Sequence, residues 1–191
     1  QIEKERFARA QRALLDTQYP VAERSLQGIL KAHPHQADVH FLLALNYFLR
    51  DSLALSAVAS EGAARLAHHR DGDTNMMVRL ADRSSRQRQD GAAVLPRWRE
   101  LRSSHSKDPV VELAYLVSTR FLHEPKVLLE SIDSAQRRFP EHPVFSSLKL
   151  KTLFGLGQYE ASMKAANLAH LRFPASASFL LEVANAELRL G

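Results

Sequence analysis

The stretch RFPEHPVF, residues 138–145, returns as RFPASASF at residues 172–179, with Arg, Phe, Pro and the final Phe in the same places. The two copies begin 34 residues apart. A fixed period between about 20 and 50 residues indicates a small supersecondary unit that stacks on copies of itself, because one unit alone cannot bury its apolar face. The stretch therefore predicts a repeat architecture.

Helix-ending loops recur along the rest of the chain at similar intervals. Their marker residues are Pro34, His68, Pro109, Pro140 and Pro174. Proline lacks a backbone N–H and disfavours helix at the residue before it, so it ends one helix before the next begins. Between these loops apolar residues recur at spacings of three and four, as at Leu26, Ile29 and Leu30, which is the period of an amphipathic helix. The sequence therefore predicts an all-α protein with two helices in each interval.

Small and large residues occupy fixed places within these intervals. In HFLLALNY the pattern positions are His40, Leu43, Ala44 and Tyr47. In three other segments they are Ala22, Leu26 and Pro34, then Leu128, Ile132 and Pro140, then Ser162, Ala166 and Pro174. These spacings resemble the tetratricopeptide repeat family, whose unit is a helix pair of about 34 residues. The resemblance implies a right-handed α-solenoid of stacked antiparallel helix pairs.

The resemblance covers residues 1–191 as a single array of about five helix pairs, followed by a terminal helix at 176–190. The third repeat, residues 71–108, is overlong and poor in small packing residues, and Pro96 is expected to begin its second helix. Ser176 or Ser178 is expected to cap the terminal helix. Its predicted apolar stripe is Leu180, Val183, Ala184 and Leu188, packed on Ala165, Leu168 and Ala169.

The resemblance also implies a function. First helices of such pairs line a concave face that binds peptides or partner proteins, so we expect a protein-binding scaffold. The positions carried onto this face are Phe7, Phe41, Leu45, Phe48, Val117, Arg120 and Lys151. The helix at 39–49 is apolar nearly all round, which leaves two interpretations open. Either neighbouring helices bury it, or one face forms a hydrophobic groove for a partner helix.

The net charge lies in one segment. Residues 79–107 hold eight Lys or Arg against three Asp or Glu, and the difference equals the formal net charge of +5. Arg79, Arg83 and Arg86 share one stripe of a helix, and guanidinium forks bind carboxylate or phosphate in bidentate geometry. One interpretation is a site for an acidic protein partner, and another is a solvated basic face with Trp98 filling a gap in the repeat. Nucleic acid is disfavoured because the rest of the chain has no basic excess.

The sequence holds no motif for catalysis, metal binding or cofactor binding. It has no cysteine, no GxSxG and no glycine-rich phosphate loop, and His33, His35 and His40 lack the partners of a metal site. We therefore predict no enzyme activity, no metal and no cofactor. No apolar run approaches the roughly 18 residues of a membrane span. The absence of cysteine suits a reducing or an oxidising compartment, with the cytoplasm slightly favoured over the periplasm.

Two further possibilities stay open beside the scaffold. The exposed apolar ends of the array could stack head to tail, which would make the chain self-associate. Alternatively, the array could be a regulatory or substrate-presenting domain of a larger enzyme, or of a polysaccharide-export or secretion component.

Overall fold

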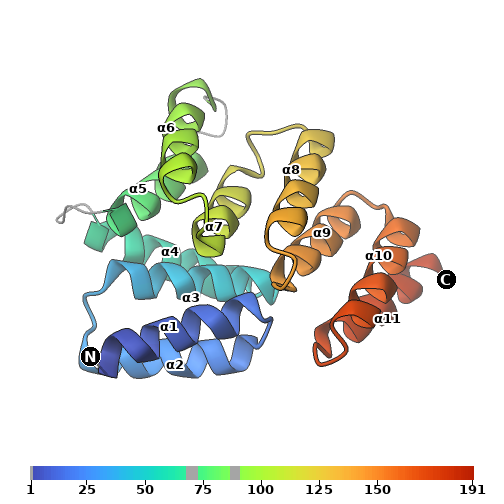
Figure 1. The fold of residues 1–191 in the computed structure, drawn as a ribbon, viewed down its shortest axis with the longest axis horizontal. Coiled ribbons are helices and arrows are strands. Elements are labelled where there is room, and N and C mark those ends of the chain that lie inside the picture. The colour runs from blue at the N-terminus through green and yellow to red at the C-terminus, as the bar shows by residue number, and fades with distance from the viewer. Residues whose placement is uncertain (1, 68–72, 87–90) are drawn as a thin grey trace. The chain divides into compact units, whose positions relative to one another are not determined.

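The computed structural model describes residues 2–67, 73–86 and 91–191, and all regular secondary structure within these ranges is helical. The helices are α1 (Ile2–Leu15), α2 (Tyr19–Ala32), α3 (Ala37–Leu49), α4 (Leu53–Ala67), α5 (Asp73–Arg86), α6 (Gly91–Ser104), α7 (Pro109–Thr119), α8 (Pro125–Arg138), α9 (Val144–Gly155), α10 (Tyr159–Arg172) and α11 (Ser178–Leu190) (Figure 1). The prediction of an all-α protein is confirmed. Within the same ranges, none of the helices combines the length and the apolarity that crossing a bilayer requires.

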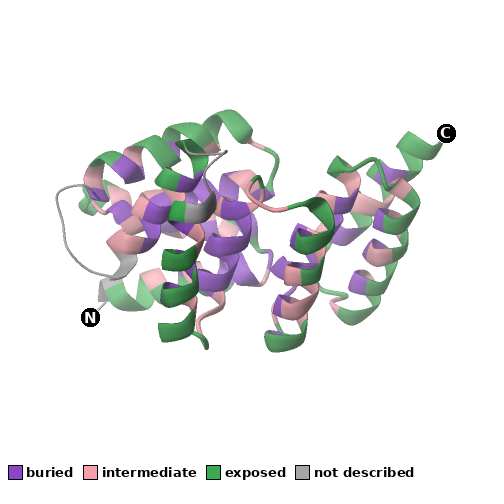
Figure 2. Ribbon diagram, turned by 90° about the horizontal axis from the view of Figure 1, so that it is seen from above, coloured by how far each residue is buried: buried purple, intermediate pink, exposed green. Residues whose placement is uncertain are grey.

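The chain divides into two compact units. Unit 1 comprises Gln1–Leu14 and Tyr19–His123, and unit 2 comprises Leu15–Gln18 and Glu124–Gly191. Helices that follow one another in the chain pack together within each unit, such as α3 with α4 and α5 with α6 in unit 1, and α9 with α8 and α10 in unit 2. Helices α3 and α7 are buried along most of their length. Figure 2 colours the buried residues of the chain purple.

The turns inside the helix pairs repeat one backbone geometry. Thr17, Asp51 and Gly157 each adopt a positive φ, of 57°, 60° and 73°, in the turns α1–α2, α3–α4 and α9–α10. Glycine adopts this left-handed conformation without strain, and aspartate tolerates it better than a β-branched residue such as Thr17 does. In the last two turns the next residue donates its N–H to a carbonyl five residues earlier, at 2.9 and 3.0 Å, which closes the end of the preceding helix.

The two helices of a pair are also joined by a recurring hydrogen bond. Ser56 Oγ of α4 donates to the carbonyl of Ala44 in α3 at 2.8 Å. Ser162 Oγ of α10 donates to the carbonyl of Leu150 in α9 at 3.2 Å. In both cases the donor lies 12 residues after the acceptor. A small serine at this place lets the two backbones approach closely, so the same contact appears in both units.

The repeated stretch forms the same aromatic contact in both of its copies. Phe139 and Phe145 have ring centroids 5.6 Å apart, and Phe173 and Phe179 have centroids 6.3 Å apart. The arginine that precedes the first Phe lies over its ring in both copies, at 4.9 and 5.3 Å. The final Phe of each copy enters the next helix and is fully buried. In each copy, therefore, the loop after one helix packs against the first turns of the next helix.

The expectation that Pro96 begins a helix is wrong. Helix α6 begins at Gly91, so Pro96 lies inside it and removes one intrahelical hydrogen bond. Val94, Trp98 and Leu101 are almost completely buried and follow one another at spacings of four and three. Their packing requires helical geometry on both sides of the proline, which explains why the helix starts before it.

The expected details of the terminal helix are wrong in part: Val183, Ala165 and Ala169 pack together as predicted, but the cap and the leucines differ. Helix α11 begins at Ser178 after Ala177, and no side chain caps it; Ser176 Oγ instead lies 2.9 Å from Ser178 Oγ. Leu168, Leu180 and Leu188 are exposed, contrary to the predicted stripe. The side chains that pack here are Phe179, Val183 and Ala186 on α11, and Leu150, Ala165, Ala166, Ala169 and Phe173 on the preceding elements.

Candidate functional site

A cavity of about 500 Å³ lies within unit 1, between helices α3, α4, α5 and α7. Its wall brings together six of the residues that the sequence proposed for partner binding. These are Phe41, Leu45, Phe48, Arg86, Val117 and Arg120. They come from three helices and the residue after α7, so the association depends on tertiary packing rather than on sequence proximity. We call this feature the apolar cavity.

The rim of the apolar cavity carries two large apolar side chains that the sequence analysis missed. Leu53, the first residue of α4, is 62% exposed, and Phe121, just after α7, is 52% exposed. Both line the cavity. An apolar residue at the start of a helix or in a loop belongs to no helical stripe, so periodicity gives no signal for it.

Arg120 and Arg86, two arginines that line the apolar cavity, both contact neighbouring groups. The Arg120 guanidinium lies 4.5 Å from the ring centroid of Phe48 and 4.2 Å from that of Phe121, and it donates to the carbonyl of Val117. Arg86 Nε donates to Asp82 Oδ1 at 2.9 Å. Both guanidinium groups are thus held in place by neighbouring groups of unit 1.

The interpretation that neighbouring helices bury the helix at 39–49 describes most of it, and the interpretation as a groove for a partner helix stays a prediction. Helix α3 is buried along most of its length, and Phe48 is half-buried. One face of the same helix, with Phe41, Leu45 and Phe48, lines the apolar cavity. The apolar residues all round this helix therefore serve packing on most sides and the cavity wall on one side.

The predicted arginine stripe is divided by the fold. Arg79 and Arg83 line a second cavity of about 420 Å³, together with Arg97 from α6. Arg86 instead lines the apolar cavity and pairs with Asp82, which lines both cavities. We call the second feature the arginine cavity. Arg97 joins the other two arginines because α5 and α6 pack as neighbours, a contact that sequence spacing does not reveal.

Phe7 and Lys151 lie elsewhere. Phe7 lines a small cavity of about 150 Å³ in unit 1, together with Gln11 and Leu42. Lys151 belongs to α9 of unit 2, where its Nζ lies 3.8 Å from Glu182 Oε1 and its side chain is 12% exposed. The Lys151 side chain is thus engaged within its own unit.

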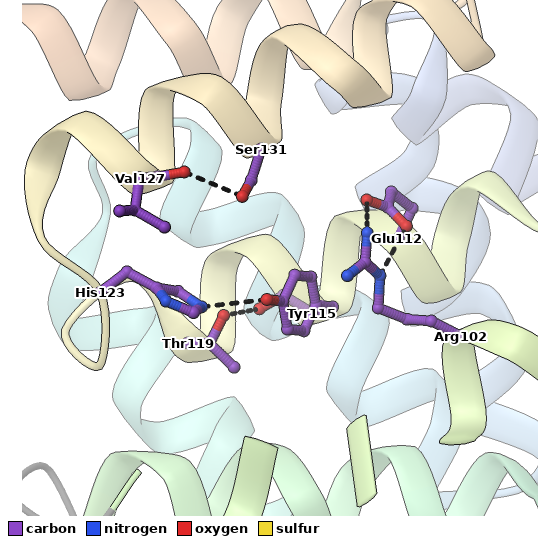
Figure 3. Close-up of polar contacts among 7 residues, drawn as sticks. All are labelled: Arg102, Glu112, Tyr115, Thr119, His123, Val127 and Ser131. Carbon is purple, nitrogen blue, oxygen red and sulfur yellow. Dashed lines mark hydrogen bonds and ion pairs between the residues drawn. The ribbon is translucent and has the colours of Figure 1, made fainter. Parts of the chain in front are cut away.

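Polar side chains from α6, from α7 and from the residues after α7 lie close together in unit 1 (Figure 3). Arg102 donates two hydrogen bonds to the buried carboxylate of Glu112, at 2.9 and 2.6 Å, and its guanidinium lies 4.0 Å from the Tyr115 ring centroid. The Tyr115 hydroxyl lies 3.0 Å from His123 Nε2. Burial lowers the pKa of His123, and the positive charges of Arg102 and Arg99 lower it further.

Trp98 is fully buried beside this cluster. Its Nε1 donates to Ser84 Oγ at 3.0 Å, and its ring meets Tyr115 edge to face at a centroid distance of 5.8 Å. A ring in this position cannot stack on a nucleic-acid base. The interpretation that Trp98 fills the space inside the third helix pair agrees with these contacts.

In the described part of the chain, no three His, Asp or Glu side chains gather into a group that could hold a metal ion. His40 Nε2, from the histidine-rich loop region, lies 3.0 Å from the carbonyl of Pro34. Comparison with protein-family models and with curated proteins gave no match to this chain. Function is therefore inferred from the two cavities themselves.

Proposed function

We propose that this chain is a non-catalytic protein-binding module, and that its apolar cavity takes an apolar segment of a partner protein or peptide. The observation that carries the proposal is the wall of this cavity, where Phe41, Leu45, Phe48 and Val117 meet beside the exposed Leu53. Its volume of about 500 Å³ falls within the usual range for sites that enclose a ligand.

The driving force for this binding is burial of the exposed rim. The side chains of Leu53 and Phe121 are exposed to water. Complete burial of a large apolar side chain contributes about 1.5 to 3 kcal/mol to the binding free energy. The partner segment is best supplied by an amphipathic helix, whose apolar face places anchor residues at spacings of three and four in such a site. Arg120 and the hydroxyl groups of Ser60 and Ser118 on the wall offer polar contacts that orient the segment.

We further propose that the helix pairs are tetratricopeptide-like repeats that form a right-handed α-solenoid. Support comes from the recurring left-handed turn residues Thr17, Asp51 and Gly157, and from the recurring bonds of Ser56 and Ser162 across a helix pair. Thr17 and Asp51 are 34 residues apart, as are the two copies of the repeated stretch.

The test uses peptides selected from a displayed random library on the purified chain, with affinities measured by fluorescence anisotropy. Leu53→Ser and Phe121→Ala should each weaken a selected peptide about tenfold or more, since each removes apolar area that the complex buries. Both side chains are exposed, so these variants should fold normally.

Leu55→Ser is the matched control for Leu53→Ser. Leu55 lies on the same helix and is 52% exposed, but it does not line the apolar cavity. Its variant should bind the selected peptide as the original chain does. Equal weakening by Leu55→Ser, or full affinity in Leu53→Ser and Phe121→Ala, would show that the peptide binds elsewhere and would contradict the proposal.

A further inference from the structure

Three arginines from two helices line the arginine cavity. Arg79 and Arg83 lie on α5, and Arg97 lies on α6. The other described residues on the wall are Met76, Leu80 and Asp82. Leu80 is buried, so part of the wall is apolar, whereas the side chains of Arg83 and Arg97 are exposed and can reach a ligand from solvent.

These three arginines have no ion pair or hydrogen bond with another residue in the part of the chain that the structure describes. Asp82, the one carboxylate that the described residues contribute to the wall, is bound by Arg86 at 2.9 Å. Among the described residues, the charge of the three arginines is therefore poorly compensated. Like charges held in one cavity repel each other, and binding of an anion relieves this repulsion.

The presence of three arginines in this cavity indicates which class of anion it binds. A guanidinium is a planar fork that binds two oxygens of one group at once, and all three cations here are arginines rather than lysines. A phosphomonoester presents three terminal oxygens and a charge of about −1.5 to −2 at neutral pH. A carboxylate has two oxygens and one charge, and the phosphodiester of a nucleic acid has two terminal oxygens and one charge.

We propose that the arginine cavity binds the phosphomonoester of a phosphorylated side chain in a partner protein. A nucleic acid is disfavoured because Trp98, the tryptophan of this basic segment, is buried, and because residues outside 79–107 carry no net charge. The site is separate from the apolar cavity and goes beyond the protein-binding function proposed above. Asp82 lines both cavities, so a bound phosphate would lie beside the apolar segment of the same partner.

The experiment titrates the full chain with N-acetyl-phosphoserine-N-methylamide and follows the Nε–Hε signals of its arginines by NMR. The signals of Arg79, Arg83 and Arg97 should shift together and give one dissociation constant. Arg79→Gln and Arg97→Gln should each weaken binding about tenfold, because each removes a charge-assisted contact to the phosphate. Circular dichroism and thermal melting verify that the variants fold.

Asp82→Asn should increase the affinity of the chain for the phosphoserine derivative, a result that a misfolded variant cannot produce. It removes the negative charge from the wall and releases Arg86 from its ion pair, so the phosphoserine derivative should bind several-fold more tightly. Arg24→Gln is the matched control, because Arg24 is an exposed arginine on α2 that lines neither cavity. Its variant should leave the dissociation constant unchanged.

Two probes of other anion classes complete the design. N-acetyl-glutamate-N-methylamide and dimethyl phosphate should bind at least several-fold more weakly than the phosphoserine derivative. Tighter binding of either probe would overturn the assignment in favour of an acidic peptide or a nucleic acid. An unchanged constant in Arg97→Gln, or an Arg24 signal that shifts as much as that of Arg79, would overturn the site itself. These experiments need no protein partner, so their outcomes do not affect the separate test of peptide binding in the apolar cavity.

Discussion

Asn46 is a fully buried polar residue inside the apolar helix α3. Neither its side-chain nitrogen nor its side-chain oxygen has a hydrogen-bonding partner among the residues described. Burying an unsatisfied polar group typically costs about 1 to 3 kcal/mol. Asn46→Leu should therefore raise the free energy of unfolding by about 1 to 2 kcal/mol, as measured by urea denaturation. Unchanged or lowered stability would mean that the amide has a partner or a role that its burial conceals.

His123 makes the stability of unit 1 depend on pH. Its folded-state pKa is lowered below the ordinary value of 6.5 by burial and then by Arg102 and Arg99, while Tyr115 holds its Nε2. Because the unfolded chain then binds the proton more readily, this contribution to stability is complete above about pH 6.5. It is lost as the pH falls from there towards the lowered folded-state pKa. We expect the thermal midpoint to fall over this range.

The histidine variant isolates that contribution. In His123→Gln the part of the pH dependence that lies just below pH 6.5 should be smaller than in the original chain, as followed by thermal melting at several pH values. The other titratable groups are common to both chains, so they cancel in the comparison. Identical pH profiles for the two chains would contradict the assignment.

At the scale of the helix, α11 shows how one aromatic residue selects a packing face. Phe179 is fully buried against Leu150 and Ala166, whereas its neighbour Leu180 is 52% exposed. Phe179→Ala should lower the stability of unit 2 by about 3 to 5 kcal/mol, because it leaves a cavity in the core. Leu180→Ala, the control one residue away, should change it by no more than about 0.5 kcal/mol.

The measurement for α11 is denaturant unfolding with hydrogen exchange of the amides in residues 144–190 as a local probe. A larger effect from Leu180→Ala than from Phe179→Ala would restore the packing face that the sequence alone suggested. Leu168 and Leu171 on α10 and Leu181 and Leu188 on α11 are exposed and do not belong to this core. Substitutions of these leucines should therefore leave the core intact.

At the scale of the whole molecule, the candidate binding residues are divided between the two units. The apolar cavity and the arginine cavity both lie in unit 1, and Lys151 lies in unit 2. The charge is divided in the same way, because the basic segment 79–107 belongs to unit 1. Unit 1 therefore holds the features on which both binding proposals rest, and unit 2 contains the two copies of the repeated stretch.

The sequence by itself determined the helical content and which residues share a face of one helix. Apolar residues at spacings of three and four allow burial only in a helix, and proline together with the turn residues limits where each helix can end. Phe41, Leu45 and Phe48 lie on one face of a single helix, so their common position in the apolar cavity follows from helical geometry. Val117 and Arg120 were assigned to the same surface through the resemblance to a repeat family, which implies that equivalent residues of different helices share one side.

Only the tertiary structure decided which of several allowed faces is buried. Helix α11 has a broad apolar face, so both Phe179 and Leu180 fit an amphipathic stripe, and the contact of Phe179 with Phe173 selects between them. Likewise, Arg79, Arg83 and Arg86 share one stripe of α5, but the neighbouring helices divide them between two cavities and bring in Arg97. Periodicity fixes the positions of side chains around one helix axis, whereas packing between helices fixes what each side chain meets.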